Sequence, residues 1–103
     1  MRILLVEDDP VLQAVVQRSL TDSGHRVEAA GDLATASHWW RVQPFDAVLL
    51  DLNLPLHERP GSGMGSGLML LREVRSRGDK TPVLVLTARN RTDERIAGLD
   101  AGA

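Results

Sequence analysis

The sequence predicts an α/β fold built on a parallel sheet, because short apolar runs alternate with segments of helical periodicity along 103 residues. Two of the apolar runs, residues 3–6 and 47–50, stop at acidic residues, and a third, residues 82–86, stops at a threonine. Continuous apolar runs of this length are typical of strands that are buried on both faces. Four strands and four helices are expected, joined by right-handed crossovers in one domain.

The composition excludes several classes of function. A net charge of -2 leaves no basic surface for nucleic acid, and the lack of cysteine excludes disulfides and thiolate chemistry. No apolar run approaches the roughly 20 residues of a membrane helix, and the N-terminus lacks the layout of a signal peptide. We therefore expect a cytoplasmic protein that makes no contact with membranes.

The first half of the chain contains clear helix boundaries. Asp9 can cap a helix whose first position is Pro10, and Gly24 lies where that helix should end. The apolar residues of this helix recur at helical spacing, at Leu12, Val15, Val16 and Leu20. Residues 26–30 form a weaker alternating strand near an edge. Asp32 can cap a second helix, which Pro44 ends.

The second half repeats the alternation. Residues 47–50 are the central strand, and a glycine-rich loop separates them from a third helix that Gly78 closes. Residues 82–86 form a further buried strand, and a last helical pattern begins near Thr92. In the second helix, the Trp39-Trp40 pair should place one ring in the core and the other partly outside.

Acidic residues follow two of the predicted strands. Asp8 and Asp9 follow the first strand, and Asp51 ends the central one. If these strands are neighbours, the three carboxylates meet at the edge of the sheet where open α/β folds bind ligands. Each charge raises the pKa of the others, and a divalent cation removes that cost. A site made of oxygen ligands suits Mg²⁺.

Thr87 would add a hydroxyl at the end of a third strand. The alternative is that these residues have only structural roles. Asp8 and Asp9 would then be a helix cap and an exposed acid, and Thr87 an ordinary hydroxyl at the end of a strand. Their joint occurrence at the ends of three strands favours a shared site.

These residues resemble the receiver domain of two-component response regulators over the whole chain. The matching segments are LLVEDD (residues 4–9), DLNLP (51–55), LTA (86–88) and AGA (101–103). Each segment is short, but their order and their places at strand ends are specific. The resemblance implies a flavodoxin-like, doubly wound parallel sheet in three α/β/α layers, with residues 1–103 as one receiver domain.

The resemblance also implies roles. Asp51 would accept a phosphoryl group from a histidine kinase as an aspartyl phosphate. Asp8, Asp9, Asp51 and the backbone carbonyl of Asn53 would hold Mg²⁺, and Thr87 would hydrogen-bond the phosphoryl oxygens and act as the switch. The protein would be no enzyme beyond self-catalysed phosphorylation and dephosphorylation. The implied output is transcription, through a DNA-binding domain outside these residues.

Two features depart from the family pattern. The family usually has a glycine eight residues after the phosphoacceptor, where Arg59 stands here, and Gly67 looks equivalent. This implies an insertion within residues 57–65, beside the site. The chain also stops at Ala103, before the fifth strand, active-site lysine and fifth helix of the family. We therefore expect a C-terminally incomplete receiver that self-associates through the exposed edge of residues 83–86, if these residues are the whole polypeptide.

Two other functions remain open. A phosphatase of the haloacid dehalogenase type also uses an aspartyl nucleophile and Mg²⁺ on a parallel sheet. That family has a second acid two residues after its nucleophile, where Asn53 stands here, and its nucleophile lies near the start of the chain. The other alternative is a receiver-like interaction module that is not phosphorylated.

Overall fold

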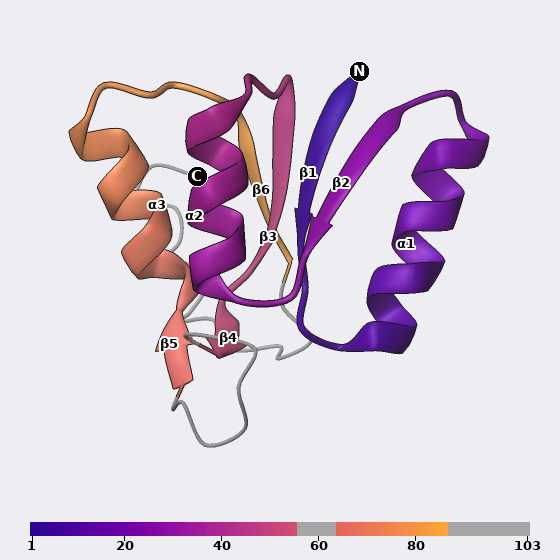
Figure 1. The fold of residues 1–103 in the computed structure, drawn as a ribbon, viewed down its shortest axis with the longest axis horizontal. Coiled ribbons are helices and arrows are strands. Elements are labelled where there is room, and N and C mark those ends of the chain that lie inside the picture. The colour runs from indigo at the N-terminus through magenta and orange to yellow at the C-terminus, as the bar shows by residue number, and fades with distance from the viewer. Residues whose placement is uncertain (56–63, 87–103) are drawn as a thin grey trace.

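Four parallel strands form the central sheet of the computed structural model, in the order β2-β1-β3-β6 (Figure 1). The structure describes residues 1–55 and 64–86. The strands are β1 (Arg2–Val6), β2 (Arg26–Ala30), β3 (Ala47–Asp51) and β6 (Val83–Leu86). The predicted parallel sheet is confirmed, and the first and third strands are neighbours. The helix expected from Thr92 lies outside the described residues.

Three helices connect these strands: α1 (Pro10–Asp22), α2 (Leu33–Val42) and α3 (Gly67–Ser76). The chain moves from β1 to β2 in one direction across the sheet and from β2 to β3 and β6 in the other. Right-handed crossovers therefore place α1 on one face, and α2 and α3 together on the other. This is the doubly wound arrangement that the sequence predicted.

The helix boundaries follow the predicted signals. The side chain of Asp9 caps α1, and Asp32 Oδ1 accepts the N–H of Thr35 at 2.6 Å to cap α2. Gly24 and Gly78, which follow α1 and α3, have φ angles of 93° and 84°, values that side chains other than glycine rarely adopt. None of the helices in the described part of the chain is long and apolar enough to cross a membrane.

The main core lies between the sheet and the helices α2 and α3. Its members are Leu4, Val6, Ala30, Ala36, Trp40, Phe45, Val48, Leu50, Leu54, Leu70, Leu71 and Val74. Trp40 is buried and Trp39 is half-buried, as predicted for this pair. Helix α1 covers its own face of the sheet less completely, because none of its residues is fully buried and Leu12 and Val15 are exposed.

An antiparallel hairpin replaces part of the loop that the sequence predicted after Asp51. Its strands are β4 (Asn53–Pro55) and β5 (Met64–Ser66), and they form a two-stranded sheet of their own. The glycine-rich composition of this region gave no strand signal. The hairpin is held instead by tertiary structure, since Leu54 is fully buried in the main core. Helix α3 begins directly after β5.

Candidate functional site

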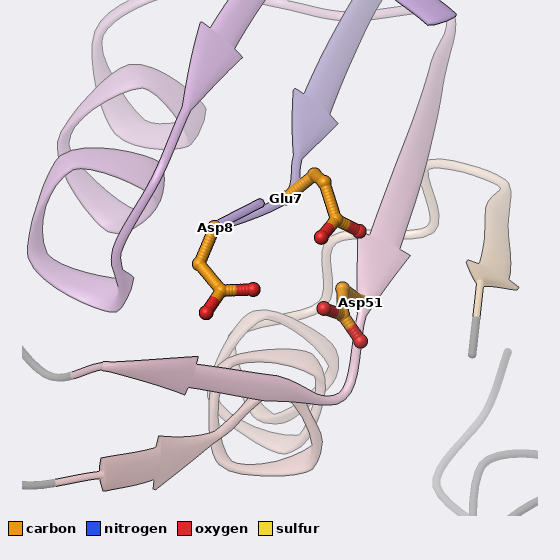
Figure 2. A group of neighbouring side chains, drawn as sticks. All are labelled: Glu7, Asp8 and Asp51. Atoms are coloured by element: carbon orange, nitrogen blue, oxygen red, sulfur yellow. The ribbon is translucent and has the colours of Figure 1, made fainter. Parts of the chain in front are cut away.

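Three carboxylates meet at the carboxyl edge of the two central strands (Figure 2). They belong to Glu7, Asp8 and Asp51, and one oxygen atom of each lies within 4.8 Å of the other two. The register of the sheet explains this, because Val6 of β1 pairs with Leu50 of β3, which puts the next residues of the two strands opposite each other. We call Glu7, Asp8 and Asp51 the acidic cluster.

The two members of the cluster at the strand ends are buried. Glu7 is 5% exposed and Asp51 is 8% exposed, whereas Asp8 is exposed. The backbone of Glu7 extends the sheet, since its N–H donates to the carbonyl of Ala30 at 2.9 Å. Its own carbonyl accepts the side-chain amide of Gln13 at 2.8 Å. Both backbone groups of Glu7 are therefore held by hydrogen bonds at the edge of the sheet.

The crowding of negative charge changes the acidity of Glu7. Its pKa is raised from 4.5 to about 7, first by burial and then by the charges of Asp51 and Asp8 and a hydrogen bond with Asp51. The N–H of Asp9, which donates to Glu7 Oε1 at 3.1 Å, opposes this rise. At pH values below about 7 Glu7 therefore keeps its proton, which a divalent cation could replace.

The cluster differs from the predicted set of ligands in one member. The sequence analysis placed Asp8, Asp9 and Asp51 together, whereas the structure joins Asp8 and Asp51 to Glu7. Asp9 lies outside the cluster, and its Oδ1 accepts the N–H groups of Val11 and Leu12 at 2.9 and 3.2 Å as the cap of α1. The predicted cap role of Asp9 is confirmed, and its predicted role as a metal ligand stays a prediction.

The ends of the two apolar runs in the sequence would have identified Glu7 as the partner of Asp51. Apolar side chains end at Val6 in β1 and at Leu50 in β3, so the first acid after each run occupies the equivalent position. Side chains at paired positions of parallel strands point to the same face. Aligning the ends of the two runs pairs Glu7, rather than Asp9, with Asp51.

The remaining predicted site residues are Asn53 and Thr87. Asn53 is the first residue of β4, two positions beyond the phosphoacceptor candidate. Thr87 lies outside the described residues, so its predicted role stays a prediction.

Gly67 lies against the backbone of the cluster. A Cβ atom at this position would overlap the backbone oxygen of Asp51 and would come within 3.1 Å of the Cα of Leu52. The N–H of Gly67 also donates to the carbonyl of Leu52 at 2.9 Å. Gly67 thus opens α3 at the place where the sequence analysis expected the glycine of the family.

Comparison with known proteins gives a consistent result. A family model described as "Response regulator receiver domain" matches residues 3–103. The response regulator MprA of Mycobacterium avium is 43% identical over 103 residues, and these span all of this chain but 42% of that protein. The MprA protein of Mycobacterium leprae has the same identity and coverage. The chain thus spans less than half the length of the curated relatives that it matches.

Solved structures agree on the fold. The non-phosphorylated HemR receiver domain from Leptospira biflexa has a TM-score of 0.82 at 36% identity, over 99% of this chain and 76% of that one. The receiver domain of Francisella response regulator 1452 has a TM-score of 0.85 at 24% identity, over 99% and 78% of the two chains. The second similarity concerns the fold alone.

Proposed function

Because the chain belongs to the response regulator receiver domain family, we propose that Asp51 accepts a phosphoryl group from a histidine kinase with the help of Mg²⁺. A receiver is a phosphoacceptor rather than an enzyme, and a histidine kinase is the partner that the family implies. One observation carries the proposal: the buried carboxylate of Asp51 shares the rim of the sheet with two other carboxylates within 4.8 Å.

The acidic cluster fits a hard divalent cation. Carboxylate oxygens, with one member open to solvent, match the preference of Mg²⁺ for oxygen ligands and retained waters. We propose that Asp8 and Asp51 hold the ion together with the backbone carbonyl of Asn53. We propose Glu7, which lies in the acidic cluster, for the second acidic place that the resemblance assigned to Asp9. The bound ion would neutralise charge on the incoming phosphoryl group.

The residues of this chain would then act as follows. A carboxylate oxygen of Asp51 attacks the phosphorus of a phosphohistidine, so that a P–O bond forms while the P–N bond breaks and the imidazole keeps the electron pair. Positioning in line with the leaving group supplies most of the acceleration in such transfers. Glu7 would release its proton to solvent if a cation were held by the cluster. Thr87, which follows Leu86 in the sequence, would hydrogen-bond the phosphoryl oxygens and shift the surrounding loops between two arrangements.

The output belongs to a longer protein. Residues 1–103 align with 42% of the length of the MprA response regulators. We propose that these residues are the receiver part of such a regulator and that phosphorylation controls transcription through a DNA-binding domain elsewhere in it.

A second proposal concerns the 103-residue chain in isolation. In the described part of the chain, β6 pairs with β3 on one side, and Leu84 of β6 is 61% exposed. Among the described residues β6 has a pairing partner on one side only, and we propose that this edge and the exposed Leu84 side chain favour self-association. Sedimentation velocity at rising protein concentration should show a dimer or larger species. A monomer at every concentration would exclude self-association of the isolated chain.

The decisive experiment is incubation with phosphoramidate and Mg²⁺, followed by intact mass spectrometry. The expected result is one added phosphoryl group that is absent from Asp51→Asn. Asp22→Asn is the matched control, because Asp22 lies on α1 at the surface and should leave the adduct unchanged. Release of phosphate without an adduct would favour a phosphatase. Absence of any reaction would favour an unphosphorylated interaction module.

A further inference from the structure

The β4–β5 hairpin starts and ends beside the phosphoacceptor. β4 begins two residues after Asp51, and β5 ends at the residue before Gly67. Figure 2 shows β4 continuing from the end of β3 next to the acidic cluster, with β5 on the side of β4 away from the three carboxylates. The two strands flank the segment 57–65, in which the sequence departs from the family pattern, and β5 includes its last residues.

The direction in which each backbone group of the hairpin points depends on whether its residue belongs to a hydrogen-bonded or a non-hydrogen-bonded pair. The register pairs Asn53 with Ser66, Leu54 with Gly65 and Pro55 with Met64. Extending this register by one residue pairs Leu52 with Gly67, and the N–H of Gly67 does donate to the carbonyl of Leu52. In an antiparallel ladder, hydrogen-bonded and non-hydrogen-bonded pairs alternate.

The alternation leaves the carbonyl of Asn53 outside the ladder. Since Leu52 and Gly67 form a hydrogen-bonded pair, the next pair, Asn53 with Ser66, is non-hydrogen-bonded. The backbone N–H and carbonyl of Asn53 therefore point away from β5, toward the free edge of β4. Pro55, which has no N–H to donate, falls at an equivalent non-hydrogen-bonded position and is compatible with this phase.

The hairpin is also fixed to the core beside the cluster. The side chain of Leu54 is fully buried among the residues of the main core. At the other end, Gly67 packs against the backbone oxygen of Asp51. A one-residue slip of the pairing would turn Leu54 out of the core and exchange the ladder positions of Asn53 and its neighbours. Burial of Leu54 thus fixes the strand register in which the Asn53 carbonyl points away from β5.

We propose that the β4–β5 hairpin is a positioning element for the cation: its pairing phase holds the backbone carbonyl of Asn53 toward the acidic cluster as a preformed ligand. The inference rests on the proposed function, since it concerns the same cation. Elements that orient metal ligands commonly change metal affinity when they are disrupted. The hairpin would have this effect through backbone pairing, without any contact between its own side chains and the ion.

The test compares two proline substitutions in β5. Gly65→Pro removes an N–H at a hydrogen-bonded position, whereas Met64→Pro removes one that points out of the ladder. Titration calorimetry with Mg²⁺ should show an affinity loss of about tenfold for Gly65→Pro, at the low end of effects on ligand-orienting groups. Met64→Pro should stay within about twofold of the wild type, since it leaves the ligand in place.

A cross-strand disulfide can restore the strand pairing in Gly65→Pro, which shows whether a loss of Mg²⁺ affinity comes from lost pairing or from general misfolding. The pair of residues 53 and 66 is of the non-hydrogen-bonded kind, whose close Cα atoms suit a cross-strand disulfide, and the chain has no other cysteine. In the Gly65→Pro background, Asn53→Cys with Ser66→Cys should regain Mg²⁺ affinity when oxidised and lose it again when reduced. The ligand is the backbone carbonyl, so replacing the Asn53 side chain should not matter.

The outcomes separate the two proposals. If the wild type binds no Mg²⁺, the proposed function fails and the inference fails with it. If the wild type binds Mg²⁺ and Gly65→Pro binds equally well, only the positioning role of the hairpin is overturned. Equal losses in Gly65→Pro and Met64→Pro would also overturn it, because the pairing phase would then have no influence.

Discussion

Gly67 and Asp51 are in contact through backbone atoms, and no side chain fits between them: a Cβ atom on Gly67 would overlap the backbone oxygen of Asp51. The first residue of α3 is therefore fixed against the peptide that carries the proposed phosphoacceptor. Movement of the Asp51 peptide would therefore be felt directly at the start of α3.

Gly67→Ala should destabilise the protein by about 1–3 kcal/mol, the usual cost of forcing extra volume into a filled site. Its urea-unfolding midpoint should fall, and labelling by phosphoramidate should slow because Asp51 is displaced. Gly31→Ala is the matched control, since a Cβ atom there would meet its nearest neighbours at 3.9 Å, an ordinary contact distance. Equal stability of the two variants would contradict the close contact.

Glu7 should make the metal-free protein less stable as the pH rises. In the folded state its pKa is about 7, compared with 4.5 for an unperturbed glutamate, so the folded protein keeps a proton that the unfolded chain releases. The contribution of Glu7 to stability is therefore fully present below pH about 4.5 and is lost as the pH passes about 7.

The measurement is the free energy of unfolding in urea with EDTA, at several pH values across this range. The difference between wild type and Glu7→Gln isolates the titration of Glu7, because the amide cannot ionise. In a separate binding titration without EDTA, the affinity of the protein for Mg²⁺ should rise with pH over the same range, because the cation displaces the proton of Glu7. A difference that does not depend on pH would contradict the raised pKa.

Asp8 and Asp9 should separate into a ligand and a helix cap. Asp8→Ala should abolish Mg²⁺ binding with little change in stability, because Asp8 is exposed. Asp9→Ala should retain Mg²⁺ binding but lose about 1 kcal/mol of stability with the cap of α1. Asp9→Ser, which can still cap the helix, should restore most of that stability. Loss of Mg²⁺ binding in Asp9→Ser would instead support the ligand role that the sequence suggested for Asp9.

Leu71 should be among the most costly positions to truncate. It is fully buried between α3 and the sheet, so Leu71→Ala should cost about 2–5 kcal/mol through lost burial and a residual cavity. Met69, on the same helix, is 58% exposed and serves as the control, with Met69→Ala expected to change stability by less than about 0.5 kcal/mol. Chemical denaturation measures both. Similar losses in the two variants would contradict the packing of α3.

The fold was predictable because its signals are local. Asp9 and Asp32 mark helix starts, Gly24 and Gly78 mark helix ends, and uninterrupted apolar runs mark strands. β1 and β3 are largely buried as expected, whereas the prediction that residues 82–86 form a buried strand was wrong, because Leu84 of β6 is exposed. Each signal acts within a few residues, so it can be found without knowing the rest of the structure. The handedness of the connections follows from the crossover rule. The order of the strands does not, and the flavodoxin-like arrangement was instead implied by the family resemblance.

The parts that were missed depend on contacts distant in sequence. The β4–β5 hairpin contains Pro55 and Gly65, which argue against strands, and it forms because Leu54 enters a core built by other elements. The position of Glu7 opposite Asp51 depends on the register between β1 and β3, which becomes evident only when the ends of the two apolar runs are compared with each other. Long-range pairing decided both features.

The acidic residues follow β1 and β3, the two inner strands of the order β2-β1-β3-β6. Strands in the middle of a sheet exchange their amide hydrogens last, because they open only when the surrounding structure unfolds. Fluctuations that fray β2 or β6 would leave the backbone under Glu7 and Asp51 in place. A site mounted on these inner strands can keep its charges assembled while the outer strands of the described sheet move.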